Sequence, residues 1–136
     1  MKLENINIRE DFQQELPKIQ GEPQLLQQVF FDLLVNARWA IKKKSKEGGL
    51  ITIHTSYNAP AREVEVSVSD TGIGISRENL DKIFEPFFTT KEVGEGTGLG
   101  LSMVYSIVTN HNGTIRAESV LNKGATFNMR FPVQPV

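Results

Sequence analysis

A long amphipathic pattern over residues 23–44 limits the folds that are open to this 136-residue chain. Apolar residues recur there at helical spacing, and Pro23 suits the first turn of a helix. The pair Gly48-Gly49 ends the pattern. The sequence therefore predicts one long amphipathic helix near the N-terminal end of the chain.

Segments in which apolar and polar residues alternate predict a sheet beside this helix. Two of them, residues 50–55 and 63–69, are joined by the turn-rich stretch 57–60 and predict a hairpin. The expected strands and extended pieces cover residues 3–9, 16–19, 50–55, 63–69, 114–118 and 125–131.

Two further helices are expected in the second half of the chain. Ser76 begins a capping sequence for a short helix that runs through Ile83. From Leu101 a second long helix is predicted, with a left-handed cap near Asn112-Gly113. Residues 84–100 lie between them, are rich in glycine, threonine and charge, and predict a mobile loop.

This order of elements predicts an α+β fold. We expect an α/β sandwich in which a mixed sheet of about five strands is covered on one face by about three helices. A doubly wound fold would alternate strands and helices regularly, which this chain does not. With 39% hydrophobic and 23% charged residues, residues 1–136 are expected to form a single soluble domain with one core.

Composition excludes several classes of function. The net charge of −1 does not indicate a surface that binds nucleic acid. The basic cluster at residues 42–46 is typical of a solvated helix end. The absence of cysteine excludes disulfides, thiol catalysis and zinc-cysteine sites. Because no apolar run reaches the ~20 residues of a membrane span, we expect a cytoplasmic domain without direct membrane contact.

Two glycine-rich motifs indicate a ligand. Asp70 in SDTGIGI (69–75) ends an alternating strand, which places a carboxylate at a sheet edge, although a simple turn has the same sequence. The stretch GEGTGLGLS (94–102) precedes a helix N-terminus and suits phosphate, with a plain flexible loop as the alternative. The P-loop and Rossmann patterns do not fit this second motif.

Asp32 and Asn36 lie four positions apart on the predicted long helix and therefore on one face, at the edge of its apolar arc. Side-chain oxygens at such an edge suit a hard cation, because Mg²⁺ typically takes one or two protein ligands besides waters and substrate phosphates. Solvated residues without a ligand are the alternative.

Four segments resemble, in order, the four boxes of the histidine-kinase ATP-binding domain (HATPase_c), one branch of the GHKL superfamily. They are QVFFDLLVNARWA (28–40), DTGIGI (70–75), FEPFFTTK (84–91) and GTGLGLSMV (96–104). The segments HNGTI (111–115) and GATFNMRFP (124–132) resemble the closing strands of the family, so the resemblance covers nearly the whole chain. It implies a Bergerat-type ATP-binding fold with ATP and Mg²⁺ as cofactors.

The resemblance implies that Asp70 accepts a hydrogen bond from the exocyclic amine of adenine. Gly72 and Gly74 would let the backbone pass close to the purine, with Ile73 and Ile75 as apolar surface. The complete nucleotide-binding set that it implies is Asn36, Ala40, Asp70, Gly72, Gly74, Ile75, Phe88, Thr89, Thr90, Lys91, Gly96, Thr97, Gly98, Leu99, Gly100, Leu101 and Thr126.

For the phosphates, the resemblance implies that Asn36 ligates a bridging Mg²⁺ and that Lys91 neutralises the terminal phosphate. The amides of residues 98–101 would cradle the phosphates. Asn36 and Asp32 are the implied metal ligands, and the same two residues with Lys91 form the implied catalytic set. The implied hydroxyl donors are Thr89, Thr90 and Thr97.

Three positions depart from the family pattern. Asp32 stands where members often have asparagine, and a carboxylate there either binds Mg²⁺ directly or orients an attacking water. Trp39 replaces a common polar phosphate contact and is expected to pack or stack. Ala125 follows Gly124 in place of a hydroxyl residue, which leaves Thr126 as a substitute.

The remaining aromatic and histidine residues are expected to be structural. The phenylalanines of FEPFFTTK are interpreted as hinge and core anchors: Phe84, Phe87 and Phe88. His54 lies in a predicted strand and His111 in a predicted turn, so neither has the helical-hairpin setting of a phosphoacceptor.

We therefore expect a monomeric catalytic fragment of a sensor histidine kinase in a two-component system. It would transfer the γ-phosphate of Mg·ATP to a histidine on a separate helical-hairpin dimerisation domain of the same kinase, with a response regulator downstream. Whether the full-length protein has a membrane anchor elsewhere stays open. The alternatives are a GHKL ATPase clamp module that uses Asp32, a non-catalytic nucleotide-sensing module, and a serine kinase of the anti-sigma type.

Overall fold

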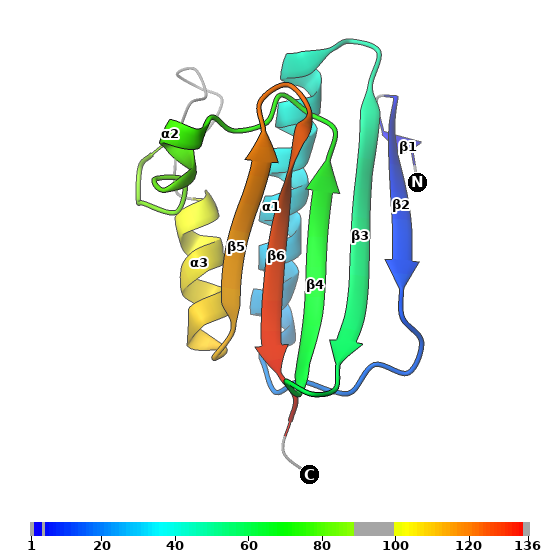
Figure 1. Cartoon of the computed structure of the whole chain (residues 1–136), viewed down its shortest axis with the longest axis vertical. Coiled ribbons are helices and arrows are strands. Elements are labelled where there is room, and N and C mark those ends of the chain that lie inside the picture. Colours follow the sequence, from blue (N-terminus) through cyan, green and yellow to red (C-terminus); the bar gives the residue numbers. More distant parts are fainter. Residues whose placement is uncertain (1, 4, 89–99, 135–136) are drawn as a thin grey trace.

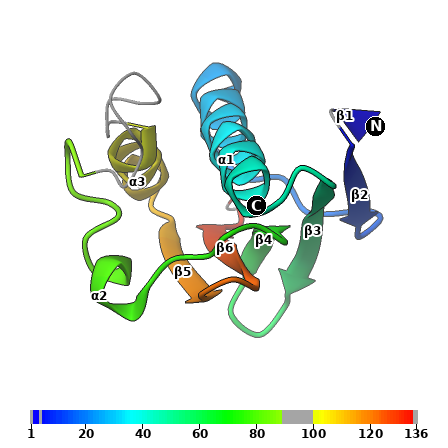
Figure 2. The same cartoon turned by 90° about the horizontal axis from the view of Figure 1, so that it is seen from above.

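The computed structural model describes residues 2–3, 5–88 and 100–134. They form one mixed sheet with the strand order β1-β2-β3-β4-β6-β5. The two long helices lie on one face of it, and the short helix lies beside the β5 edge (Figures 1 and 2). The strands are β1 (Lys2–Leu3), β2 (Ile6–Phe12), β3 (Gly49–Asn58), β4 (Glu63–Asp70), β5 (Thr114–Val120) and β6 (Gly124–Pro132). The helices are α1 (Pro23–Lys44), α2 (Arg77–Leu80) and α3 (Gly100–Asn110).

The strand pairing confirms the predicted α+β sandwich. β2 and β3 are parallel and the other neighbouring strands are antiparallel, so the sheet is mixed. Because β1 has two residues, five strands carry the sheet. β3 and β4 form the predicted hairpin, and β4 also pairs with β6. Asp70, the last residue of β4, therefore lies between Ile51 of β3 and Ala125 of β6.

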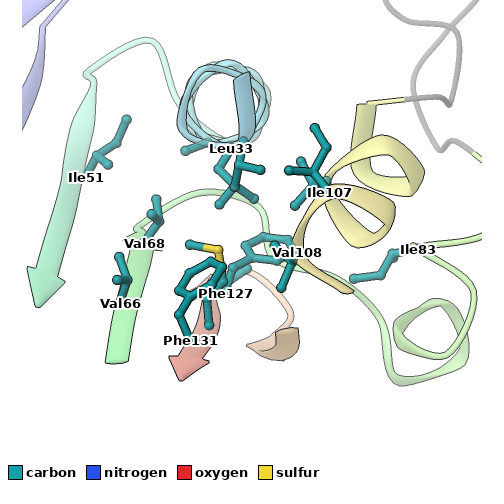
Figure 3. Packing of buried hydrophobic residues seen from close by; sticks show 14 of the residues in the cluster. Leu33, Ile51, Val66, Val68, Ile83, Ile107, Val108, Phe127 and Phe131 are labelled. Carbon is teal, nitrogen blue, oxygen red and sulfur yellow. The ribbon is translucent and has the colours of Figure 1, made fainter. Parts of the chain in front are cut away.

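A single core fills the space between the helices and the sheet. The valines of β4 alternate inward as predicted, and α1 and α3 turn their apolar stripes toward them. Figure 3 shows Leu33 of α1 and Val108 of α3 in one cluster with Phe127 of β6. The largest fully buried side chains are Phe127, Ile6, Leu33, Ile41, Met129, Val29, Val68, Val104 and Val108.

Several predicted ends of elements are confirmed by their capping contacts. The Ser76 hydroxyl accepts a hydrogen bond from the Asn79 amide (3.3 Å) at the start of α2. After α3, Asn112 has the expected left-handed conformation (φ 61°), and the Gly113 amide donates to the Val108 carbonyl (2.9 Å). These helix ends could be predicted from the sequence because each depends on residues that are close along the chain.

Other predicted ends were wrong. The first strand covers residues 6–12 instead of 3–9, and α2 ends at Leu80. The extended piece expected at residues 16–19 contributes one antiparallel bridge, between Ile19 and Val133. The predicted loop lies outside the described residues from position 89 to 99.

The three lysines in the last turn of α1 confirm that the basic cluster is a helix end, where cations interact favourably with the helix dipole. None of the helices in the described part of the chain is long and apolar enough to cross a membrane.

Two leucines of α1 test this packing. Leu33 is 1% exposed, whereas Leu25 on the same helix is 40% exposed. We expect Leu33→Ala to lower the free energy of unfolding by about 2–5 kcal/mol, because it leaves a cavity in the core. Leu25→Ala should lower it by less than about 1 kcal/mol. Urea unfolding measures both values, and equal losses would contradict the core described here.

Candidate functional site

The segment from Asp70, the last residue of β4, to Ile75 is called here the aspartate loop. Backbone contacts tie it to β3 and α1. Thr71 donates its amide to the Leu50 carbonyl (3.1 Å) and accepts the Leu50 amide with Oγ1 (2.9 Å). The Ile73 amide donates to the carbonyl of Ala40 near the end of α1 (3.0 Å). The loop is thus fixed to both neighbours before any ligand binds.

The β5–β6 hairpin holds the same loop from a third side. The Asn122 amide in the turn donates to the Ile73 carbonyl (2.6 Å). The Ile75 amide donates to Ser119 Oγ (2.7 Å), and Ser119 Oγ donates to the Gly124 carbonyl (2.7 Å). The aspartate loop is therefore a preorganised part of the fold.

Asp70 is the one buried charged residue in the described part of the chain, with 7% of its surface exposed. Its Oδ1 accepts the amide of Gly72 (2.8 Å), and the backbone of Ala125 also hydrogen-bonds the carboxylate. Burial raises the pKa of Asp70, and these two hydrogen bonds offset part of that rise. A carboxylate has about four acceptor sites, so capacity remains for a ligand donor.

Close packing against protein explains both glycines of the aspartate loop. A Cβ on Gly72 would lie 2.5 Å from the carbonyl carbon of Ala40. Gly74 has φ +76°, and a Cβ there would lie 2.5 Å from the carbonyl oxygen of Val120. The two positions therefore need glycine for contacts with α1 and with the hairpin. The predicted approach of this backbone to a purine stays a prediction.

Asp32 and Asn36 are half-buried on α1, as expected for residues at the edge of its apolar arc. Gln28 Nε2 donates to Asp32 Oδ1 (2.8 Å), and burial raises the pKa of Asp32 more than this bond lowers it. Asn36 lies one helical turn before Ala40, the residue that holds the aspartate loop. One helix thus carries both the polar pair and a contact of the loop.

The polar pair has the donor chemistry of a magnesium site. Asp32 and Asn36 offer carboxylate and amide oxygens, and Mg²⁺ needs only one or two protein ligands when substrate phosphates and waters complete its shell. The described residues contain no group of three or more histidine, cysteine, aspartate or glutamate side chains arranged for a metal. The residues fit a magnesium ion that shares its coordination with a nucleotide.

The other predicted site residues are distributed as follows. Ile75 and Phe88 are half-buried and pack against the core. Gly100 and Leu101 begin α3, which packs beside α1 (Figure 2). Seven predicted residues lie outside the described part of the chain: Thr89, Thr90, Lys91, Gly96, Thr97, Gly98 and Leu99.

Thr126 does not join the site. Its hydroxyl lies 2.9 Å from that of Ser69, which precedes Asp70 in β4. Successive residues of a strand point to opposite faces, so Thr126 and Ser69 share the face opposite Asp70. Ala125 occupies the position on the Asp70 side, and it contributes its backbone instead of a hydroxyl.

The phenylalanines of FEPFFTTK differ in environment. The ring centroid of Phe84 lies 5.5 Å from Tyr105 and 6.3 Å from Phe127, which confirms it as a core anchor. Phe88 also packs on the core. Phe87 is 72% exposed with φ 66°, so the prediction that it anchors the core was wrong.

Trp39 and the two histidines have the structural contacts expected of them. Lys43 Nζ lies 5.9 Å from the ring centroid of Trp39, a cation–π contact. His54 Nδ1 lies 2.8 Å from a carboxylate oxygen of Asp11 on the next strand.

His111 links the two long helices. Its Nε2 accepts the amide of Glu22, the residue that caps α1 (3.0 Å), and its Nδ1 contacts the Ile107 carbonyl of α3 (2.7 Å). The start of α1 is thus held by the end of α3.

Sequence reasoning missed Ser119. The signal was a hydroxyl residue in the inward row of β5, where Ile115 and Ala117 are apolar and half-buried. Such a position normally takes an apolar residue, so a serine there needs hydrogen-bond partners inside the fold.

Comparison with known proteins places this geometry in a family. The sequence profile described as "Histidine kinase-, DNA gyrase B-, and HSP90-like ATPase" matches residues 21–135. The sensor histidine kinase ZraS of Escherichia coli K12 is 43% identical over 128 residues, which cover 94% of this chain and 26% of ZraS.

Solved structures agree with this match. A nucleotide-free catalytic domain of the histidine kinase ThkA has a TM-score of 0.78 and 35% identity, covering 97% of this chain and 83% of that one. Full-length ShkA in complex with AMPPNP has a TM-score of 0.82 and 27% identity, covering 98% of this chain and 27% of ShkA. The chain spans 14–26% of the length of the first curated relatives.

The raised pKa of Asp70 predicts how stability depends on pH. Between the usual aspartate value of 3.8 and the higher value in the folded state, the folded chain holds more protons than the unfolded chain. The contribution of Asp70 to stability therefore falls as pH rises through this window. Asp70→Asn removes this titratable group. The free energy of unfolding of the variant should therefore increase relative to that of wild type as pH rises through this window. Urea unfolding across this pH range measures the difference, and a difference with the opposite slope would contradict the assignment.

Proposed function

The chain belongs to the family of histidine kinase-, DNA gyrase B- and HSP90-like ATPases, and from this premise we propose that it binds Mg·ATP for transfer of the γ-phosphate to a histidine on another domain. The observation that carries the proposal is the buried, preorganised carboxylate of Asp70 with free acceptor capacity. The sensor histidine kinases among its relatives support the same function.

Asp70 recognises adenine in this proposal. Its carboxylate accepts a hydrogen bond from the exocyclic amine, a donor that guanine does not have at that position. Because the aspartate loop is held by backbone contacts, little ordering is needed when the base binds. Ala40 and Gly72 form the wall beside the base.

Asn36 would bind the Mg²⁺ that accompanies the phosphates, with Asp32 as a second oxygen donor. When bound, Mg²⁺ supplies positive charge that neutralises the phosphates and orients them. The backbone amides at the N-terminus of α3, at Gly100 and Leu101, favour negative charge nearby. Lys91 is assigned to the terminal phosphate from its motif alone.

The reaction is a transfer of one phosphoryl group. A nitrogen of the acceptor imidazole bonds to the γ-phosphorus as the bond from that phosphorus to the β–γ bridging oxygen breaks. ADP leaves with the electron pair, and the imidazole proton passes to solvent. Positioning and charge neutralisation account for most of the catalysis in such transfers, so no nucleophile on this chain is required.

The partners follow from this chemistry. The acceptor histidine belongs to a helical-hairpin domain of the same kinase, and a response regulator receives the phosphoryl group afterwards. We place the domain in the cytoplasm, where ATP is available, and infer that it is monomeric without the hairpin.

Calorimetric titration with ADP and AMPPNP, with and without Mg²⁺, tests nucleotide binding. Asp70→Asn should weaken both nucleotides by about 10- to 100-fold, because a hydrogen bond to a buried charge is worth about 1.5–3 kcal/mol. Asn36→Ala should remove mainly the Mg²⁺ dependence. Asp11→Asn removes an exposed carboxylate from the far edge of the sheet and should leave affinity unchanged. A folded wild type that binds neither nucleotide would refute the proposal.

ATP hydrolysis is a second candidate function, and the environment of Asp32 favours it. Burial raises the pKa of this carboxylate, and it lies one turn before Asn36, where it can orient a water. Steady phosphate release by the isolated chain that Asp32→Asn abolishes would support hydrolysis. Labelling of an added hairpin domain from γ-labelled ATP, without such release, would support transfer to histidine.

A further inference from the structure

Ser119 is the one hydroxyl in the inward row of β5. Its Oγ accepts the Ile75 amide and donates to the Gly124 carbonyl, both at 2.7 Å. The side chain is half-buried, and these bonds use its donor and one acceptor site. A hydroxyl with two short hydrogen bonds at this position fixes two backbone groups relative to each other.

The two groups that Ser119 joins belong to two segments that contact Asp70, the aspartate loop and the start of β6. Ile75 is the last residue of the aspartate loop. Gly124 begins β6 and lies so close to β4 that a Cβ on it would be 2.0 Å from the Asp70 carbonyl oxygen. The next residue, Ala125, hydrogen-bonds the Asp70 carboxylate. One hydroxyl therefore links the end of the aspartate loop to the strand whose backbone hydrogen-bonds the carboxylate.

We propose that Ser119 is a positioning residue for adenine recognition, because its hydroxyl holds the aspartate loop and the start of β6 in the geometry that lets Asp70 recognise an exocyclic amine. The inference rests on the proposed role of Asp70. A carboxylate distinguishes a purine with the amine from one without it only when its oxygen points at that amine. Ser119 acts on this orientation and does not touch the base.

Loss of the hydroxyl has a local effect. The aspartate loop keeps its other contacts, from Ile73 to Ala40, from Asn122 to Ile73 and from Thr71 to Leu50. The loop therefore stays closed without Ser119, while Ile75 and the start of β6 lose their link. The preference for a purine that carries the amine therefore falls, while the free energy of unfolding changes little.

Valine and threonine have nearly the same shape, so Ser119→Val and Ser119→Thr differ mainly in the hydroxyl. Calorimetry gives the affinities for ADP and for purine riboside diphosphate, which lacks the exocyclic amine. We expect wild type and Ser119→Thr to prefer ADP by the same factor. Ser119→Val should lose about fivefold to tenfold of that preference, with the affinity for the amine-free ligand unchanged.

Two further variants complete the experiment. Ser119→Ala removes the hydroxyl without added bulk and should reproduce the loss if the valine does not fold. Thr114→Val removes an exposed hydroxyl from the outward row of β5 and should keep the wild-type preference. Urea unfolding confirms that each variant is folded, and hydrogen exchange of the Ile75 amide should accelerate only when the Ser119 hydroxyl is absent.

The outcomes separate this inference from the proposed function. A wild type with no preference for ADP overturns the role of Asp70 and this inference with it. A wild type that prefers ADP, with Ser119→Val and Ser119→Ala equally selective, overturns the inference alone. Equal weakening of both ligands also overturns it, because that result assigns Ser119 to general stability.

Discussion

A buried carboxylate at the end of the central strand is the constraint on which the rest of the site depends. Burying a charge is costly unless it is hydrogen-bonded. Here the backbone of Gly72 and of Ala125 supplies the bonds, and both donors require the chain to pass very close to Asp70. The aspartate loop and the start of β6 therefore hold Asp70 inside the fold.

The helices connect the aspartate loop to the other parts of the site. The Ala40 carbonyl ties α1 to the aspartate loop, and Asn36 lies one turn away on the same helix. At the opposite end of α1, His111 accepts the amide of Glu22 and so links the start of α1 to the end of α3. The base side and the metal side of the proposed nucleotide site are thus built on elements that are held at both ends.

Local signals allowed much of this to be predicted from the sequence. The long helix, the β3–β4 hairpin and the Asn112 cap each follow from spacing or capping among near neighbours. The exposure of Phe87 and the outward face of Thr126 depend on tertiary packing and on strand register, which spacing alone does not reveal. The Ile75 amide that Ser119 accepts is distant in sequence, so only the polar character of Ser119 in an apolar row was visible.

A crystal structure of this chain with ADP and Mg²⁺ tests the central claim most directly. The account predicts that the exocyclic amine of adenine lies about 2.7–3.2 Å from a carboxylate oxygen of Asp70. It also predicts that the metal lies beside Asn36 and that the backbone of residues 70–75 keeps the conformation seen here. A purine bound elsewhere, or an aspartate loop rebuilt around the ligand, would contradict the account.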